Sequence, residues 1–436
     1  MLAQTADDLQ QHDKTAGAIL LRVIAMLEAV GVHTCILHGY RALPASVPSD
    51  VDCVVSADPG DVIRLLVRHQ DRIGARIVRR DGSYVVLAAR GGDGLPVFLC
   101  LDMMRDCVVD DLVLYFGDEI LASRRRFGQF WIPAPHVAFA AYLARSIYKG
   151  RLDQTRIQEI EDFYQQDPGP ADAELTHFWK TGTLKLFASA AGRIDWDRVR
   201  GHAGTLRREL IWNCIRRAPL KFVLDRKGSV ARRLSRLTRP TGVVVALLGP
   251  DGAGKSSAIE ALGSALKDAF NRQEVRGFAP ALSRLWNRTP RSTAEPHGLP
   301  ARSFSLSLLR AGYWLIYNLW SHVSLHLARA RSTLVLHDRH FSDILIDPRR
   351  YRYGGPRWAL HLNIWLMPRP DIVLMLDAPA ETLQARKQEV PFAETARQLG
   401  LYREFVRALS NGHVIDADRP REQVAAQGCR REVGRN

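Results

Sequence analysis

The chain has 436 residues, 46% of them hydrophobic and 25% charged, which is enough for two or three globular domains with cores of their own. The 61 lysine and arginine residues exceed the 46 aspartate and glutamate residues and give a net charge of +15, which favours nucleotides, phospholipid surfaces or nucleic acid as partners. The first residues include acids, so a secretory signal is not expected, and no window approaches about eighteen uncharged apolar residues, so a membrane span is not expected either. We therefore expect a cytoplasmic protein.

The first part of the chain alternates short apolar runs with helical spacing. Residues 16–30 have the apolar spacing of a helix that breaks at Gly31. Strands are expected at 34–40, 51–56, 75–80, 83–89 and 96–102, with a helix at 59–70 and a hairpin turn at Asp81-Gly82. We therefore predict a small α/β domain over residues 1–134.

Helical spacing continues from residue 135 to 216, which predicts a helical appendage to the first domain. Residues 217–240 are rich in lysine and arginine and are interpreted as a basic linker. Apolar residues within 221–240 could share one helical face, so this segment is either a solvated linker or a peripheral contact with the inner face of a membrane. Nucleic acid is not expected as a partner, because no stacking aromatics are interleaved with a basic groove.

Residues 241–436 show the pattern of a doubly wound α/β domain with a parallel sheet. The run "GVVVALLG" is a buried strand, followed by a glycine-rich turn and a helix from about Ser256. Two further apolar strands, at 332–338 and 371–377, each end on an aspartate. Strands that alternate with helical stretches are typical of this fold class.

The turn "GPDGAGKSS" matches GxxxxGK[ST] between a strand and a helix, the context that a phosphate-binding P-loop requires. Backbone N–H groups and the helix N-terminus would bind the phosphates of ATP. Lys255 should reach the β- and γ-phosphates, and Ser256 should bind Mg²⁺. The expected ATP-binding residues are Gly249, Gly252, Ala253, Gly254, Lys255, Ser256 and Ser257.

Asp338 and Arg339 end the strand at 332–338, and ligands of this fold class lie beyond the carboxyl ends of strands. Asp338 can bind Mg²⁺ and Arg339 can clamp a phosphoryl group, which suits phosphoryl transfer to a second anion. The NKxD motif of GTPases is not found in the sequence.

These motifs, together with "PDIVLMLDAPAETLQARKQE" and "NGHVIDADRPREQV", resemble the thymidylate kinase family in the order of that family. The resemblance implies that Arg339 binds the acceptor phosphate, that Asp251 touches the acceptor sugar and that Arg386 belongs to a lid. It also implies that Trp314 stacks on the acceptor base, although Trp314 can equally be a core residue. The arginine that the family places four residues after this aromatic is replaced by Asn318.

The segment "IDPRRYRYGG" has no counterpart in the thymidylate kinase pattern. With its surroundings it resembles a divergent branch of thymidylate kinase-like proteins associated with bacterial surface polysaccharides. Arg349, Arg350 and Arg352 either bind a larger or more anionic acceptor or form a solvated loop.

The N-terminal domain contains "LHGYRALPASVPSDVD", which resembles the minimal nucleotidyltransferase pattern of a glycine turn followed by Asp-x-Asp. Asp50 and Asp52 lie on the same side of a strand, and Asp102 on a later strand can complete a two-metal cluster. Tyr40 stands where that family has a small residue.

The leading hypothesis is an ATP- and Mg²⁺-dependent phosphotransferase of the thymidylate kinase type, in which Lys255, Asp338, Arg339 and Arg386 act on a phosphorylated acceptor. One alternative makes nucleotidyl transfer by the first domain the main chemistry. Another is a nucleotide-binding scaffold for polysaccharide assembly without catalysis. A homodimer is considered as well.

Overall fold

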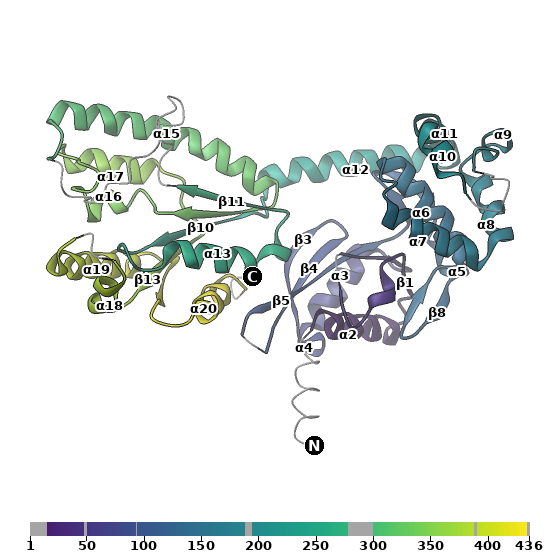
Figure 1. The fold of residues 1–436 in the computed structure, drawn as a ribbon, viewed down its shortest axis with the longest axis horizontal. Coiled ribbons are helices and arrows are strands. Elements are labelled where there is room, and N and C mark those ends of the chain that lie inside the picture. The colour runs from purple at the N-terminus through teal and green to yellow at the C-terminus, as the bar shows by residue number, and fades with distance from the viewer. Residues whose placement is uncertain are drawn as a thin grey trace, which may run out of the picture. The chain divides into compact units, whose positions relative to one another are not determined.

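The computed structural model describes residues 15–47, 50–92, 94–187, 194–277, 300–387 and 390–433. The chain forms two compact units (Figure 1). The first contains Met1–Gly91 and Val97–Leu234, and the second contains Gly92–Pro96 and Ser235–Asn436. Each unit is described on its own.

The first unit is built on a five-stranded mixed sheet of order β1-β2-β5-β4-β3. Its strands are β1 (Thr34–Ile36), β2 (Val51–Val55), β3 (Arg76–Asp81), β4 (Tyr84–Arg90) and β5 (Pro96–Met104). β2 and β5 run parallel, while β3 and β4 form the predicted hairpin, in which Gly82 adopts a φ of 65°. The predicted helices appear as α2 (Ala16–Ala29) and α3 (Pro59–Arg68), followed by α4 (Gln70–Ile73).

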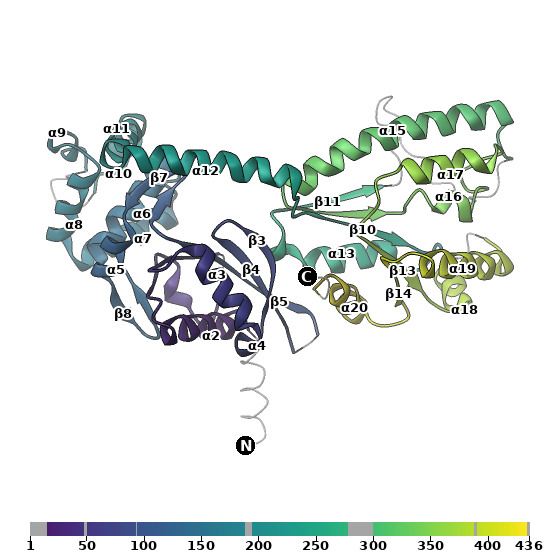
Figure 2. The same cartoon turned by 180° about the vertical axis from the view of Figure 1, so that it is seen from behind.

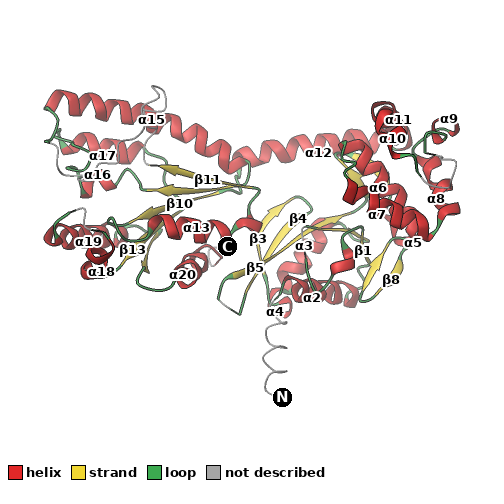
Figure 3. Ribbon diagram, in the orientation of Figure 1, coloured by secondary structure: helices red, strands yellow, loops and turns green. Residues whose placement is uncertain are grey.

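Two small hairpins were not predicted from the sequence, because each strand has only three or four residues. They are β6 (Cys107–Val109) with β7 (Leu112–Tyr115), and β8 (Arg125–Phe127) with β9 (Phe130–Ile132). The helical character predicted for 135–216 is confirmed (Figure 3). The helices after β7 are α5 (Gly117–Ser123), α6 (Pro135–Lys149), α7 (Gln154–Gln166), α8 (Pro168–Glu174), α9 (Thr181–Leu184), α10 (Trp196–Gly201) and α11 (Ala203–Arg217). Their apolar faces share one core with the sheet.

The segment predicted as a basic linker forms the helix α12 (Pro219–Thr238). Lys221 is paired with Asp106 at 2.8 Å, and Arg226 with Asp111 at 3.3 Å. Its membrane contact stays a prediction. Among the helices of the described ranges, none has both the length and the apolar content needed to cross a membrane.

The second unit contains the predicted parallel sheet, with strand order β11-β12-β10-β13-β14. Its strands are β10 (Val243–Leu248), β11 (Arg272–Gly277), β12 (Thr333–Asp338), β13 (Ile372–Asp377) and β14 (Gly412–Asp416). β11 was not predicted. It is an edge strand rich in charged residues and mostly exposed, so its sequence lacks the apolar run of a central strand.

Helices cover both faces of this sheet (Figure 2). They are α13 (Lys255–Ala265), α15 (Phe304–Ala330), α16 (Asp343–Ile346), α17 (Arg357–Leu366), α18 (Ala380–Arg386), α19 (Phe392–Arg407) and α20 (Arg421–Val433). Val335 of β12 packs with Leu325 and Ala328 of α15, whereas the next residue, Leu336, lies against Gly263 of α13. Because successive side chains of a strand face opposite ways, α15 and α13 cover opposite faces. The carboxyl ends of β10, β12 and β13 are left for the candidate site.

Candidate active site

The P-loop lies between β10 and α13, as predicted. Gly249, Gly252 and Gly254 have φ values of 145°, 83° and 82°, which residues with a Cβ rarely adopt. A Cβ at Gly252 would also lie 2.9 Å from the carbonyl oxygen of Leu383. These glycines let the chain turn tightly into the N-terminus of α13, where free N–H groups and the helix dipole favour phosphate.

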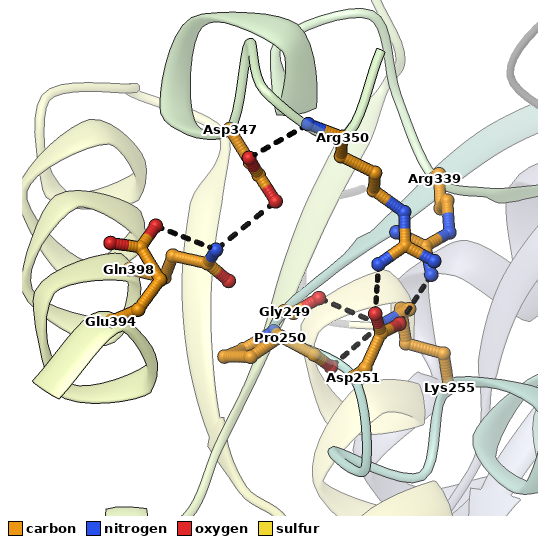
Figure 4. Close-up of polar contacts among 9 residues, drawn as sticks. All are labelled: Gly249, Pro250, Asp251, Lys255, Arg339, Asp347, Arg350, Glu394 and Gln398. Carbon is orange, nitrogen blue, oxygen red and sulfur yellow. Dashed lines mark hydrogen bonds and ion pairs between the residues drawn. The ribbon is translucent and has the colours of Figure 1, made fainter. Parts of the chain in front are cut away.

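Lys255 is the first residue of α13, and its side chain turns back into the loop. Its Nζ donates to the carbonyl oxygens of Gly249 and Pro250, both at 2.7 Å (Figure 4). Burial, followed by the positive charge of Arg339, lowers the pKa of Lys255 to about 8. A buried ammonium group held at the mouth of a phosphate-binding turn is suited to interaction with nucleotide phosphates.

A cavity of about 240 Å³ adjoins the P-loop. Its lining includes Ala253 and Gly254 from the loop, Ser257 from α13, and three arginines from the segments opposite, Arg386, Arg419 and Arg421. The structure thus places the predicted lid arginine, Arg386, next to the predicted ATP-binding residues. Arg386 donates to the carbonyl oxygen of Ala417 at 3.2 Å and pairs with Asp418 at 3.3 Å.

Ser256 and Asp338 were predicted to bind Mg²⁺. Ser256 is exposed at the start of α13, and Asp338 ends β12 in register with Leu247 of the strand that leads into the P-loop. Within the part of the chain that the structure describes, no hydrogen bond or ion pair engages the Asp338 carboxylate. A hydroxyl and an uncommitted carboxylate are oxygen ligands of the kind that Mg²⁺ prefers, so these residues fit the ion.

Two arginines converge on one carboxylate beside the P-loop. Arg339 pairs with Oδ1 of Asp251, and Arg350 pairs with Oδ2 (Figure 4). All three side chains are largely buried, with exposures of 22%, 24% and 13% for Arg339, Arg350 and Asp251. Arg339 also has a φ of 75°, a strained conformation for a residue with a side chain. This arrangement forms a cradle for a planar or tetrahedral anion.

The loop that carries Arg350 is held by a chain of hydrogen bonds to α19. The backbone N–H of Arg350 donates to Oδ1 of Asp347 at 3.1 Å. Gln398 donates to Oδ2 of Asp347 at 3.1 Å and to Glu394 at 3.0 Å (Figure 4). Asp347 is buried, so these contacts fix the position of the Arg350 backbone. Sequence reasoning left the role of Arg350 open and did not identify this support.

Asp343 was missed by sequence reasoning. It is the first residue of α16 and only 1% exposed, and the hydroxyl group of Tyr402 on α19 is the hydrogen-bonding group that faces its carboxylate. Burial raises the pKa of Asp343 to about 6, although the positive charges of Arg339 and Lys255 oppose this shift. The only signal in the sequence is an aspartate within the apolar run "FSDILI".

The other two arginines of the motif point elsewhere. The Nε of Arg352 donates to the carbonyl oxygen of Pro300 at 3.0 Å, so this side chain anchors a neighbouring segment. Arg349 is exposed. Of the three arginines in the "IDPRRYRYGG" segment, only Arg350 therefore pairs with Asp251.

Trp314 lies in a core cluster rather than on an open surface. It is 2% exposed, and its ring packs 5.6 Å from Phe341 and 6.1 Å from Tyr353, with Arg310 5.0 Å from its centroid. This placement agrees with the core interpretation and leaves no face of the ring open for a base. Asn318 is also buried and donates to the side chain of Asn363 on α17 at 3.2 Å.

The N-terminal carboxylates are only partly brought together. Asp52 and Asp102 are register partners on β2 and β5, with Asp50 just before β2. However, Oδ2 of Asp52 contacts His38 at 2.9 Å and Arg145 at 2.8 Å. Burial alone would raise the pKa of Asp52, but the hydrogen bond and charge of His38, with Arg145, lower it.

These contacts differ from the predicted two-metal cluster. Over the described ranges, no group of three or more His, Cys, Asp or Glu side chains is arranged to hold a metal ion. An arginine bound to the central carboxylate supplies the positive charge that a metal ion would bring. Asp50, Asp52 and Asp102 therefore do not fit a metal pair in this arrangement.

A parallel sheet of order β11-β12-β10-β13-β14 with a P-loop between its central strand and α13 is the architecture of a P-loop nucleotide-binding domain. No protein family model matches the chain. The chain is 31% identical over 200 residues to a thymidylate kinase of Xanthomonas campestris pv. campestris (strain B100), a match that covers 43% of this chain and 82% of the relative. It therefore belongs to the thymidylate kinase family.

Thymidylate kinases of two other Xanthomonas species match in the same way. The identity is 29% over 201 residues for Xanthomonas euvesicatoria pv. vesicatoria (strain 85-10) and 29% over 202 residues for Xanthomonas oryzae pv. oryzae (strain PXO99A). Each match covers 43% of this chain and 82% of the relative. These relatives support a nucleotide kinase-like activity for the P-loop unit.

Proposed function

We propose that the protein transfers the γ-phosphoryl group of ATP to a phosphorylated acceptor held by Arg339 and Arg350. The observation that carries this proposal is the convergence of both guanidinium groups on Asp251, beside the P-loop. A carboxylate and a phosphate share the geometry that arginine recognises. An acceptor phosphate that enters this cradle takes over hydrogen bonds that Asp251 now accepts.

The chain's own residues perform binding and charge neutralisation. Lys255 and the P-loop amides would hold the nucleotide phosphates, while Arg339 and Arg350 would hold the acceptor oxygen in line with the γ-phosphorus. In the transfer, the bond from the γ-phosphorus to the bridging oxygen breaks, a bond to the acceptor oxygen forms, and ADP leaves. Mg²⁺, for which Ser256 and Asp338 are suitable ligands, neutralises phosphate charge when bound.

Thymidine monophosphate is not favoured as the acceptor. Trp314 is enclosed by its neighbours, and Asn318 is bound to Asn363 instead of facing the site. We therefore propose a nucleotide or related phosphorylated acceptor other than thymidine monophosphate. Its setting in surface-polysaccharide synthesis rests on the resemblance of "IDPRRYRYGG" and its surroundings.

The test is an ADP-release assay with nucleoside monophosphates, sugar phosphates and glycans as acceptors. Lys255→Ala should abolish turnover, and Arg339→Ala should weaken use of the acceptor, while the double variant Asp50→Ala, Asp52→Ala should retain phosphoryl transfer. Release of pyrophosphate that depends on Asp50 and Asp52 would instead support nucleotidyl transfer by the first unit. Nucleotide binding without turnover of any acceptor would support the scaffold.

The likeness of the first unit to nucleotidyltransferases also stays a proposal. It is supported by the adjacency of Asp52 and Asp102 on parallel strands and opposed by the bond from Arg145 to Asp52. A homodimer is proposed because α15 and α17 expose large apolar side chains, including Ile316, Trp320 and Trp365, which are 66–70% exposed. Light scattering of wild type and Trp320→Glu would test this, and an unchanged monomeric mass in both would exclude it.

A further inference from the structure

A second cavity lies within the P-loop unit, between residues 345–349, α17 and α19. Its volume is about 550 Å³, which falls in the range of small-molecule sites. None of the residues that line it belongs to the P-loop, so it is separate from the cavity of about 240 Å³ beside the nucleotide loop.

The lining of this cavity carries more arginines than acidic residues. Arg349, Arg357 and Arg397 line it, with Asp347 and Glu394 as the acidic residues. Both acids already have partners. Asp347 accepts hydrogen bonds from the Arg350 backbone and Gln398, and Glu394 binds Arg397 through both oxygens, at 2.8 and 2.6 Å.

Arg349 and Arg357 differ from Arg397 in this respect. Both are exposed, and across the described ranges neither guanidinium group forms an ion pair or a hydrogen bond with the protein. Leu345 and Leu401 supply apolar surface in the same cavity. Two uncommitted guanidinium groups beside apolar side chains suit a ligand with an anionic group and a less polar body, such as a sugar ring.

The "IDPRRYRYGG" segment contributes residues both to this cavity and to the cradle formed by Arg339 and Arg350. Arg350 reaches Asp251, while its neighbour Arg349 lines the cavity. Asp347 lines the cavity and also caps the Arg350 backbone, so one buried carboxylate supports both places (Figure 4). A ligand that bridges the two would carry two anionic groups.

We infer that this cavity binds a second anionic group of the acceptor, a phosphate or a carboxylate, so that the acceptor is larger than a nucleoside monophosphate. This inference rests on the proposed function, which assigns the first anionic group to Arg339 and Arg350. It gives Arg349 and Arg357 a part in acceptor selection, and it leaves the ATP site unchanged.

The experiment uses the full chain and inorganic phosphate as the probe. Mg²⁺ and a non-hydrolysable ATP analogue first saturate the P-loop, and phosphate binding is then followed by calorimetry. Wild type should show two phosphate sites. The double variant Arg349→Ala, Arg357→Ala should weaken one of them at least tenfold, and Arg339→Ala, Arg350→Ala should weaken the other.

A charge-matched control removes two exposed arginines elsewhere in the unit, Arg331→Ala and Arg407→Ala, and should keep both sites. Equal weakening in this control, or two intact sites after loss of Arg349 and Arg357, would overturn the inference. If only the site of Arg339 and Arg350 is missing from wild type, the proposed function fails while the cavity site stands.

A second measurement requires no variant. Phenylglyoxal modifies accessible arginines, and mass spectrometry locates the modified residues. Inorganic phosphate should slow the modification of Arg349 and Arg357 at least threefold and leave Arg407 unaffected. Equal rates with and without phosphate at Arg349 and Arg357 would overturn the inference as well.

Discussion

Replacement of Asp343 by asparagine should stabilise the P-loop unit at neutral pH. The aspartate is 1% exposed, and burial raises its pKa from 3.8 to about 6 even though the Tyr402 hydroxyl and two nearby positive charges oppose this shift. At about 1.4 kcal/mol per pH unit, this shift corresponds to about 3 kcal/mol. Asparagine has nearly the same shape and carries no charge, so it removes this cost.

The sign of the pH dependence follows from proton binding. Between pH 3.8 and about 6 the folded protein holds a proton on Asp343 that the unfolded chain has lost, so its contribution to the free energy of unfolding falls as pH rises. Asp343→Asn has no titrating carboxyl group at this position, so its free energy of unfolding does not fall for this reason. Its advantage should therefore be near zero at pH 4, grow through pH 6 and reach at most about 3 kcal/mol at pH 7.

The assay is thermal unfolding of wild type and Asp343→Asn at pH 4.5, 6 and 7. The transition of the P-loop unit is the one that ATP and Mg²⁺ shift upward. For a unit of this size the expected gain in Tm at pH 7 is at most about 6–12 °C. Asp347→Asn is the matched control, because its buried carboxylate has hydrogen bonds and its loss should lower Tm. A lower Tm for Asp343→Asn at pH 7, or an equal difference at all three pH values, would refute the reasoning.

Three further outcomes are expected. Arg350→Ala should lower kcat/KM for the acceptor by about 10- to 100-fold without changing the KM for ATP, because it removes one charge-assisted hydrogen bond to the acceptor. Arg352→Ala is the control and should change neither value, because the Arg352 guanidinium binds a backbone carbonyl oxygen. Asp251→Asn should tighten inorganic phosphate binding about tenfold in calorimetry, because it removes a carboxylate that competes for both arginines. Arg145→Ala should lower the free energy of unfolding of the first unit by about 3 kcal/mol in denaturant titrations, since Asp52 loses its charged partner, and a loss under about 1 kcal/mol would contradict this.

The sequence predicts the parts of the fold that depend on local pattern. The apolar strands at 242–249, 332–338 and 371–377 and the glycine-rich turn between strand and helix appear as predicted. The edge strand β11 and the hairpins β6-β7 and β8-β9 were missed. β11 lacks an apolar run because it is an exposed edge strand, whereas the strands of the two hairpins are missed because three or four residues are too few to show a periodic pattern, although β6, β7 and β9 are largely buried.

The candidate site was predictable only where one motif holds all its residues. The P-loop is one continuous stretch of sequence, and so is the Asp338-Arg339 pair. The structure places both at one edge of the sheet. The convergence of Arg339 and Arg350 on Asp251 joins residues about a hundred positions apart, so neither composition nor spacing could show it. The role of Trp314 as a core residue depends in the same way on packing against α17 and the motif loop.

The arginines of the "IDPRRYRYGG" segment bear on how the proposed site would select its acceptor. Thymidylate kinases in the resemblance read the acceptor base with an aromatic and an arginine on the helix before the Asp-Arg pair. Here those positions are Trp314 and Asn318, which are both buried, so the proposed function needs other residues to recognise the acceptor. Arg350 pairs with Asp251 beside the P-loop, and Arg349 lines the larger cavity. Under the proposed function, a chain without accessible groups for reading a base and with guanidinium groups at two places would select its acceptor by charge rather than by base identity.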